Sequence, residues 1–300
     1  MIDNNRNIIL LDTDIGSDID DALCLAYLLS QPLCELIGIT TVTAEPQKRA
    51  MLADTICRSA GRNDIPIFSG AANPILVPQK QTECPQAEIL SFVEHRDDFE
   101  PNAAIDFMRS MIHNRPGEIT LLAIGPLTNV GLLFAIDPEI PLLLKQLIIM
   151  GGVFDVFAPN TPKREWNTLC DPHAAAIVYN AAAASHISIS LDVTLRCRID
   201  AEEARQKLQG NQMMDIIGKM AEVWLQRADK VVFHDPLAAA VIFEPDICRY
   251  QKGLCSVELC NPEEQGMTVW NPNSEEKPHR IAVDVDPKRF FDHYFSVIMS

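Results

Sequence analysis

Five aspartates lie within ten positions near the start of the chain: Asp12, Asp14, Asp18, Asp20 and Asp21. So many carboxylates in one short segment repel one another unless a positive charge lies among them. A hard divalent cation such as calcium or magnesium, held by oxygen ligands alone, would supply that charge. One or two acids are also typical of a capped helix start, but five exceed what capping requires. The spacing therefore predicts a metal site.

Two polar groups further along the chain are candidates to join this site. Glu165 and Asn167 flank a tryptophan and form a polar cluster after an irregular stretch of the chain. His234 precedes Asp235, which pairs a group that titrates near neutral pH with an oxygen ligand. Taken alone, the first group is more typical of an ordinary loop, and the second is equally typical of a capped helix start. Only their order along one chain favours a functional site.

The aspartates follow a short apolar run and precede an apolar helical pattern. Residues 8–11 are expected to form a buried strand, and residues 22–29 a helix packed on the same sheet. Gly16 allows the backbone between them to bend tightly around an ion. Ligands of open α/β sheets bind at the carboxyl ends of strands, so the aspartate turn is expected to lie at a binding edge.

Strand, turn and helix patterns repeat along the rest of the chain. Further strands are expected at residues 34–42, 65–68, 118–124, 146–150, 187–193 and 280–285. The sequence thus predicts a single α/β domain over residues 1–300. Its sheet would be open, mostly parallel and flanked by helices, with a small β-hairpin at residues 254–270 near the C-terminus. Residues 72–102 predict a long loop, a common form of lid.

The overall charge limits the partners of the protein. Forty-one acidic and twenty-five basic residues give a formal net charge of −16, which disfavours nucleic acid and anionic membranes. Apolar residues make up 47% of the chain, enough for a large core. The nine cysteines form no Cys-x-x-Cys pair and predict buried thiols in a reducing compartment. Without a pattern typical of a signal peptide or membrane span, a cytoplasmic protein is expected.

Four motifs in this order resemble those of the inosine–uridine type nucleoside hydrolases. They occupy residues 12–21, 125–129, 165–167 and 234–236. Residues 65–74 and 280–286 are also similar to family segments, so the resemblance covers nearly the whole chain. It implies an enzyme that hydrolyses a ribonucleoside to free base and ribose. It also implies a homo-oligomer, either a dimer or a tetramer.

Carried over by position, the resemblance implies a calcium ion bound by four oxygen donors. These are the carboxylates of Asp14, Asp21 and Asp235 and the backbone carbonyl of Ile124. The ion would hold and acidify a water, and Asp14 would take the proton as the water attacks the ribose. His234 would stand near the leaving base, where it could donate a proton.

The resemblance also implies residues that bind the ribose hydroxyl groups. They are Asp18 or Asp20, Asn160, Glu165 and Asn167, with Glu45 as a further candidate. Glu45 stands where many members of the family have an asparagine that touches the ribose. The aspartate turn is two residues longer than the shorter family pattern, which leaves Asp18 and Asp20 as alternatives for one role.

Two other classes of protein share part of the pattern. An aspartyl-phosphate phosphatase also places an aspartate directly after an apolar strand, and Asp12 would then be the nucleophile. That class would leave the Glu165 and His234 motifs without a role. A non-catalytic relative would keep the metal and bind a sugar-like ligand.

Overall fold

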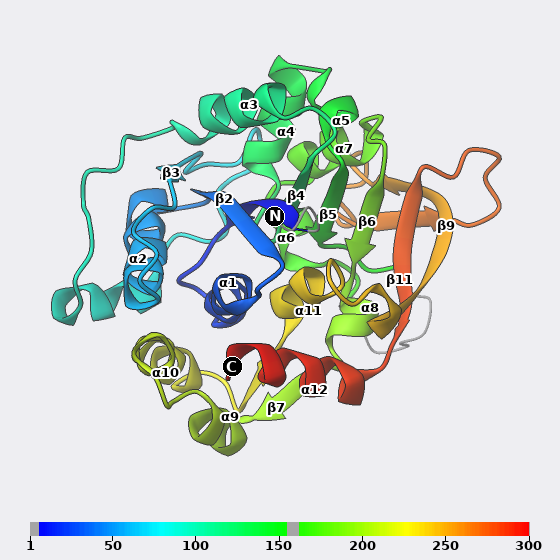
Figure 1. Ribbon diagram of the computed structural model, residues 1–300. Helices are drawn as coiled ribbons and strands as arrows, with labels where there is room; N and C mark the ends of the chain where they lie inside the picture. The colour runs from blue at the N-terminus through cyan, green and yellow to red at the C-terminus, as the bar shows by residue number, and fades with distance from the viewer. Residues whose placement is uncertain (1–5, 155–161, 300) are drawn as a thin grey trace.

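The computed structural model describes residues 6–154 and 162–299, and its centre is a nine-stranded sheet (Figure 1). Its strands are β1 (Asn7–Thr13), β2 (Cys34–Thr41), β3 (Ile67–Ser69), β4 (Ile119–Ala123), β5 (Gln146–Met150), β6 (His186–Ile189), β9 (Cys248–Val257), β10 (Thr268–Asn271) and β11 (His279–Val285). They lie in the order β10-β9-β11-β6-β5-β4-β1-β2-β3. All pairs from β3 to β11 are parallel, and β9 and β10 add an antiparallel edge. The predicted α/β fold class is confirmed.

Helices cover both faces of this sheet (Figure 1). One face carries α1 (Asp20–Ser30), α2 (Pro46–Ser59), α10 (Gln212–Leu225), α11 (His234–Ala240) and α12 (Pro287–Ile298). The other carries α3 (Ala104–Asn114), α4 (Thr128–Ile136), α5 (Ile140–Leu143) and α7 (Pro172–Asn180). The shorter elements are α6 (Trp166–Cys170), α8 (Leu191–Thr194), α9 (Ala201–Lys207) and the 3-10 helices η1 (Pro85–Phe92) and η2 (Pro245–Ile247).

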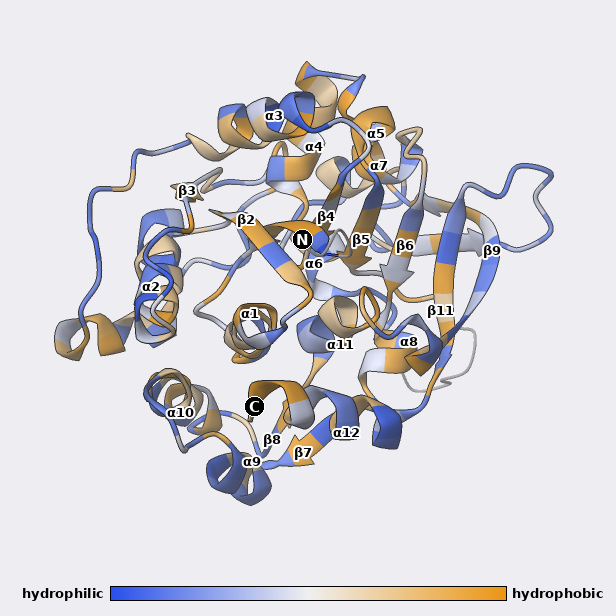
Figure 2. Ribbon diagram, viewed as in Figure 1, coloured by the Kyte–Doolittle hydropathy of each residue, from blue (hydrophilic) through white to orange (hydrophobic). Residues whose placement is uncertain are grey.

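The helices on the two faces bury two apolar cores against the sheet. Strand β1 alternates between them: Ile9 and Leu11 pack into one core and Leu10 into the other. Burial on both faces is why the strands of a parallel sheet are nearly continuous apolar runs. In Figure 2 the central strand β5 is accordingly coloured as largely hydrophobic. None of the described helices is long and apolar enough to cross a membrane.

The order of the strands places the aspartate turn at a particular point of the sheet. The chain builds β1, β2 and β3 outward in one direction and then returns to add β4 on the other side of β1. The loops that leave β1 and β4 therefore diverge to opposite sides and leave a crevice at the carboxyl ends of these two strands. Asp14 follows β1, and Ile124 follows β4.

Three local expectations differ from the structure. The strand expected at 187–193 ends at Ile189, because Ser190 hydrogen-bonds Asp192 at 2.8 Å and the chain turns into α8. An antiparallel pair of β7 (Arg198–Asp200) and β8 (Lys230–Val232) was not predicted, since its strands are short and far apart in the chain. The expected hairpin is β9 and β10, and it extends the main sheet through β11.

Candidate active site

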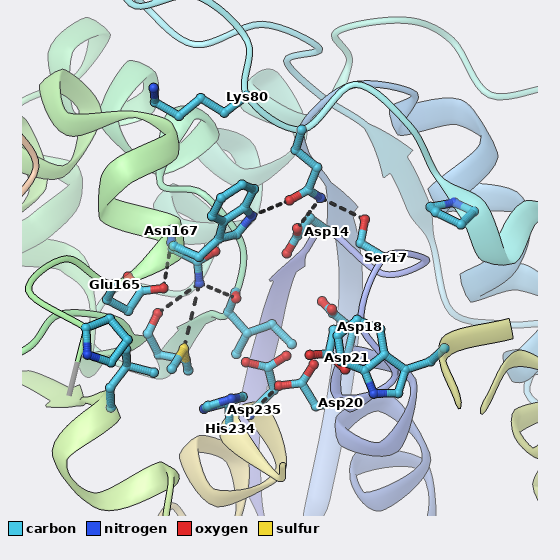
Figure 3. Close-up of a pocket in the computed structure, with 18 of the residues that line it drawn as sticks. Asp14, Ser17, Asp18, Asp20, Asp21, Lys80, Glu165, Asn167, His234 and Asp235 are labelled. Atoms are coloured by element: carbon cyan, nitrogen blue, oxygen red, sulfur yellow. Dashed lines mark hydrogen bonds between the residues drawn. The ribbon is translucent and has the colours of Figure 1, made fainter. Parts of the chain in front are cut away.

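A cavity of about 610 Å³ opens at the crevice between β1 and β4. Its floor is made by the aspartate turn and by the first turns of α1 and α11. Its walls come from the long loop near residue 81, from α6 and from Trp224 of α10 (Figure 3). Segments that are distant in the sequence therefore meet at the predicted edge of the sheet.

Three buried carboxylates converge on the floor of this cavity, those of Asp20, Asp21 and Asp235 (Figure 3). One oxygen from each lies within 4.8 Å of the others. The backbone N–H of Asp235 donates to Asp20 at 3.4 Å, and the Thr13 hydroxyl donates to Asp21. Burial, followed by repulsion from neighbouring carboxylates, raises the pKa of all three well above the usual range. Such a cluster keeps its charges only when a cation lies among them.

Asp14 lines the same cavity but does not belong to the group of three. The side-chain amide of Gln81 donates to its Oδ2 at 2.7 Å. Burial raises the pKa of Asp14, and the positive charge of Arg49 and this hydrogen bond partly oppose the rise. The structure thus gathers Asp21 and Asp235 of the predicted metal ligands with Asp20, whereas Asp14 lies beside them.

Ile124, the fourth predicted metal ligand, also lines the cavity, and its carbonyl accepts the Asn167 amide at 2.7 Å. Asn167 donates to the Met150 carbonyl as well, at 3.2 Å. This side chain therefore ties the start of α6 to the ends of β4 and β5. Asn167 lines the cavity, and its NH₂ group is committed to these two backbone carbonyls.

Glu165 is a buried helix cap as well as a cavity residue. Its carboxylate accepts the backbone N–H groups of Asn167 at 2.5 Å, Thr168 at 3.0 Å and Gly152 at 3.3 Å. Burial raises its pKa to about 7 despite these bonds. Glu165 thus shapes the wall of the site through the backbone it holds. Trp166, the next residue, is 48% exposed and donates its indole N–H to Gln81 at 2.5 Å.

The other predicted ribose ligands are placed differently. Asp18 lines the cavity, and burial raises its pKa to about 7. Glu45 lies outside the residues that line the cavity; its carboxylate binds Lys48 and accepts the backbone N–H of Cys84 at 3.1 Å. Glu45 therefore anchors the long loop. Asn160 lies outside the described residues.

His234 lines the cavity from the first turn of α11. Its Nδ1 and the Thr194 hydroxyl are 2.7 Å apart. Burial lowers the pKa of His234 to about 4, so the imidazole is neutral at pH 7. When Thr194 donates to Nδ1, the proton of the neutral ring is on Nε2 and can be donated to a ligand.

Asp12 is fully buried and does not line the cavity. Its Oδ1 accepts the Thr40 hydroxyl at 2.6 Å and the Asn129 amide at 2.8 Å. Burial raises its pKa to about 7. An aspartyl-phosphate mechanism requires an accessible nucleophile at this position, so the burial of Asp12 argues against the phosphatase alternative.

Two residues of the site were missed by the sequence analysis. Arg49 of α2 is fully buried and donates to the carbonyls of Thr43 at 2.8 Å, Ile15 at 3.0 Å and Asp14. Gln81 comes from the loop without periodicity. The signal for Arg49 was a basic residue on the inner face of an amphipathic helix. Nothing in the loop composition singled out Gln81.

Fold and site together define a class, an α/β protein with a buried carboxylate site of metal-binding type at the switch point of its sheet. Residues 9–292 match the family described as inosine-uridine preferring nucleoside hydrolase, and the chain belongs to this family. It is thus a nucleoside hydrolase, as the sequence motifs predicted.

Relatives and solved structures agree with this assignment. The probable uridine nucleosidase 1 of Oryza sativa subsp. japonica is 27% identical, with 94% of this chain and 93% of the relative covered. The pyrimidine-specific ribonucleoside hydrolase RihA of Citrobacter koseri is 29% identical, with 95% of each chain covered. The structure of a purine-preferring ribonucleoside hydrolase from Gardnerella vaginalis superposes with a TM-score of 0.83 at 24% identity, over 97% and 98% of the two chains. This last likeness shows the fold.

Proposed function

We propose that the protein hydrolyses the N-glycosidic bond of ribonucleosides with calcium bound at the carboxylate cluster. The observation that carries this proposal is the convergence of Asp20, Asp21 and Asp235 within 4.8 Å at the floor of the cavity. An all-carboxylate donor set fits a hard cation, and Asp14 and the Ile124 carbonyl line the same cavity as further oxygen donors. When bound, the ion would offset the clustered charge and acidify a water molecule.

The residues of the chain then divide the chemistry. Asp14 accepts a proton from the attacking water at Oδ1, since Gln81 already occupies Oδ2. The ribose hydroxyls bind against Asp18 and the amide oxygen of Asn167, whose NH₂ group is held by the backbone. These contacts orient the sugar and favour its oxocarbenium-like transition state. The neutral ring of His234 donates a hydrogen bond to the leaving base.

The test is a release assay on calcium-stripped and calcium-replete protein. Purine and pyrimidine ribonucleosides and one phosphate ester are supplied, and free ribose and free phosphate are measured. Calcium-dependent release of ribose is expected, and Asp14→Asn should reduce it by about 100-fold or more, as for loss of a general base. Release of phosphate without ribose would support the phosphatase class instead. Specific binding of a nucleoside without turnover would support the non-catalytic class.

Compartment and assembly belong to the same proposal. The nine free cysteines support a cytoplasmic location, because thiols persist where the compartment is reducing. Ile136 and Leu142 are each 62% exposed on neighbouring helices, which supports a contact between subunits of a dimer or tetramer. The first strand of the chain, β1, and the last, β11, belong to the same nine-stranded sheet, which supports a single domain over residues 1–300. Light scattering on the purified protein tests the assembly.

A further inference from the structure

Gln81 lies at the centre of a hydrogen-bonded bridge that joins Asp14 and Ser17 to Trp166. Its side chain is 8% exposed although it belongs to the long loop between β3 and α3. The amide nitrogen donates to Asp14 Oδ2 at 2.7 Å and to the Ser17 hydroxyl at 2.8 Å. The amide oxygen accepts the indole N–H of Trp166 at 2.5 Å. The loop is thereby joined to both the floor and the wall of the site.

The chemistry of the two partners requires a group between them that both donates and accepts hydrogen bonds. An ionised carboxylate only accepts hydrogen bonds, and an indole nitrogen only donates. The bridging group must therefore donate to Asp14 on one side and accept from Trp166 on the other. A carboxamide does both at once, whereas a carboxylate at position 81 could not donate and would repel Asp14. The same partners determine which end of the Gln81 amide faces Asp14.

The backbone of the loop is docked so that this amide reaches its place. The N–H of Gln86 donates to the Gly16 carbonyl at 3.0 Å, and its side chain donates to the Asp18 carbonyl at 2.9 Å. Arg49 donates to the Glu83 carbonyl at 3.3 Å. The loop thus has three anchors shortly after Gln81, and positions 16 and 18 of the aspartate turn receive two of them. A side chain supported in this way holds its partner with little freedom.

We propose that Gln81 is a positioning residue for Asp14 in the hydrolytic reaction. By occupying Oδ2 it holds the carboxylate in one rotamer and leaves Oδ1 directed to the attacking water, and through Trp166 it couples that rotamer to the substrate wall. The inference rests on the proposed role of Asp14 as the base. A group that orients a base acts on the transition state, so its loss lowers kcat more than it raises KM.

The kinetic test compares Gln81→Ala and Gln81→Glu with the wild-type holoenzyme on the best nucleoside of the panel. Loss of a hydrogen bond to a charged group is expected to lower kcat by about 10- to 100-fold in Gln81→Ala. KM should change by less than about threefold, because substrate binding is not the step affected. Gln81→Glu keeps the shape but should lose more activity than Gln81→Ala.

Glu88→Ala is the matched control, since Glu88 belongs to η1 of the same loop, is exposed and lies outside the residues that line the cavity. Its kcat is expected to stay within about threefold of the wild type, because loss of a strong polar contact would lower kcat by more than that. Equal losses in Glu88→Ala and Gln81→Ala would overturn the inference, as would a Gln81→Ala variant with unchanged kcat. A raised KM alone would assign Gln81 to substrate binding instead.

A spectroscopic readout tests the bridge independently of turnover. With ¹⁵N-labelled tryptophan, the three tryptophans of the chain give three indole N–H resonances, and Trp166→Phe identifies the one from Trp166. Gln81→Ala should move that resonance, and Glu88→Ala should leave it in place. An unmoved resonance would overturn the bridge. A wild-type protein that releases no ribose would refute the proposed function and with it the role of Asp14, whereas an active wild type with an active Gln81→Ala variant would refute only the role of Gln81.

Discussion

Replacement of the buried Arg49 by methionine tests how the aspartate turn is held in shape. The Arg49 guanidinium donates to the carbonyls of Asp14, Ile15 and Thr43, and it also contacts the Ser17 hydroxyl at 3.1 Å. Methionine fills most of the volume but donates nothing, so these buried acceptors lose their partner. The positive charge of Arg49 lowers the pKa of Asp14, and the change removes this charge.

The expected magnitude follows from the number of acceptors left unpaired. Each buried acceptor that loses its donor costs about 1–3 kcal/mol, and such losses are not additive within one network. We therefore expect Arg49→Met to reduce the free energy of unfolding by about 3–5 kcal/mol, the range for removing one partner of a buried charged network. With more net negative charge at the site, stability should also depend more steeply on calcium.

The assay is equilibrium unfolding in urea, with and without calcium. Lys48→Met is the control, because Lys48 lies on the same helix and its side chain is 50% exposed where it pairs with Glu45. Its urea midpoint should move far less than that of Arg49→Met, since surface ion pairs contribute little. A loss of stability in Arg49→Met no larger than in Lys48→Met would refute the reasoning that Arg49 holds the turn.

Three further predictions concern calcium, catalysis and pH. Calcium at about 100 times its Kd should stabilise the protein by about 2.7 kcal/mol in urea unfolding, and Asp235→Asn should abolish most of this gain; an equal gain in the variant contradicts the proposed site. His234→Ala should lower kcat about 100-fold on ribonucleosides. The loss should be much smaller on 4-nitrophenyl riboside, because its leaving group needs no proton. Equal losses on both substrates would count against a contact between His234 and the leaving base. Burial lowers the pKa of His186 well below its usual value in the folded protein. As the pH falls, His186 is therefore protonated in the unfolded chain before it is protonated in the folded one. Stability is therefore complete above about pH 6.5 and falls with pH below it, by up to about 1.4 kcal/mol per pH unit. His186→Phe should flatten this slope in urea titrations, and an unchanged slope would exclude His186 as a source.

Local patterns predicted most of the sheet correctly because a buried parallel strand is a short apolar run that ends at a turn. The runs at residues 118–124 and 146–150 became β4 and β5. The strand predicted at 187–193 extends into what the structure shows as α8. Its composition does not show that Asp192 also accepts the N–H of Phe154 from another loop. The pairing of β7 with β8 was missed for the same reason, because long-range pairing leaves little local signal.

The sequence by itself determined the kind of chemistry. Five aspartates in one turn and the Glu165 and His234 motifs in order establish an acidic site, because residue type and spacing are properties of the chain. Only the tertiary structure decided which carboxylates meet: Asp235 is 215 residues from Asp20 and reaches it because α11 packs beside α1. The same holds for Gln81, whose loop docks on the turn through backbone carbonyls that any sequence would present. Contacts of this kind depend on where the backbone lies in space, and residue spacing along the chain does not record them.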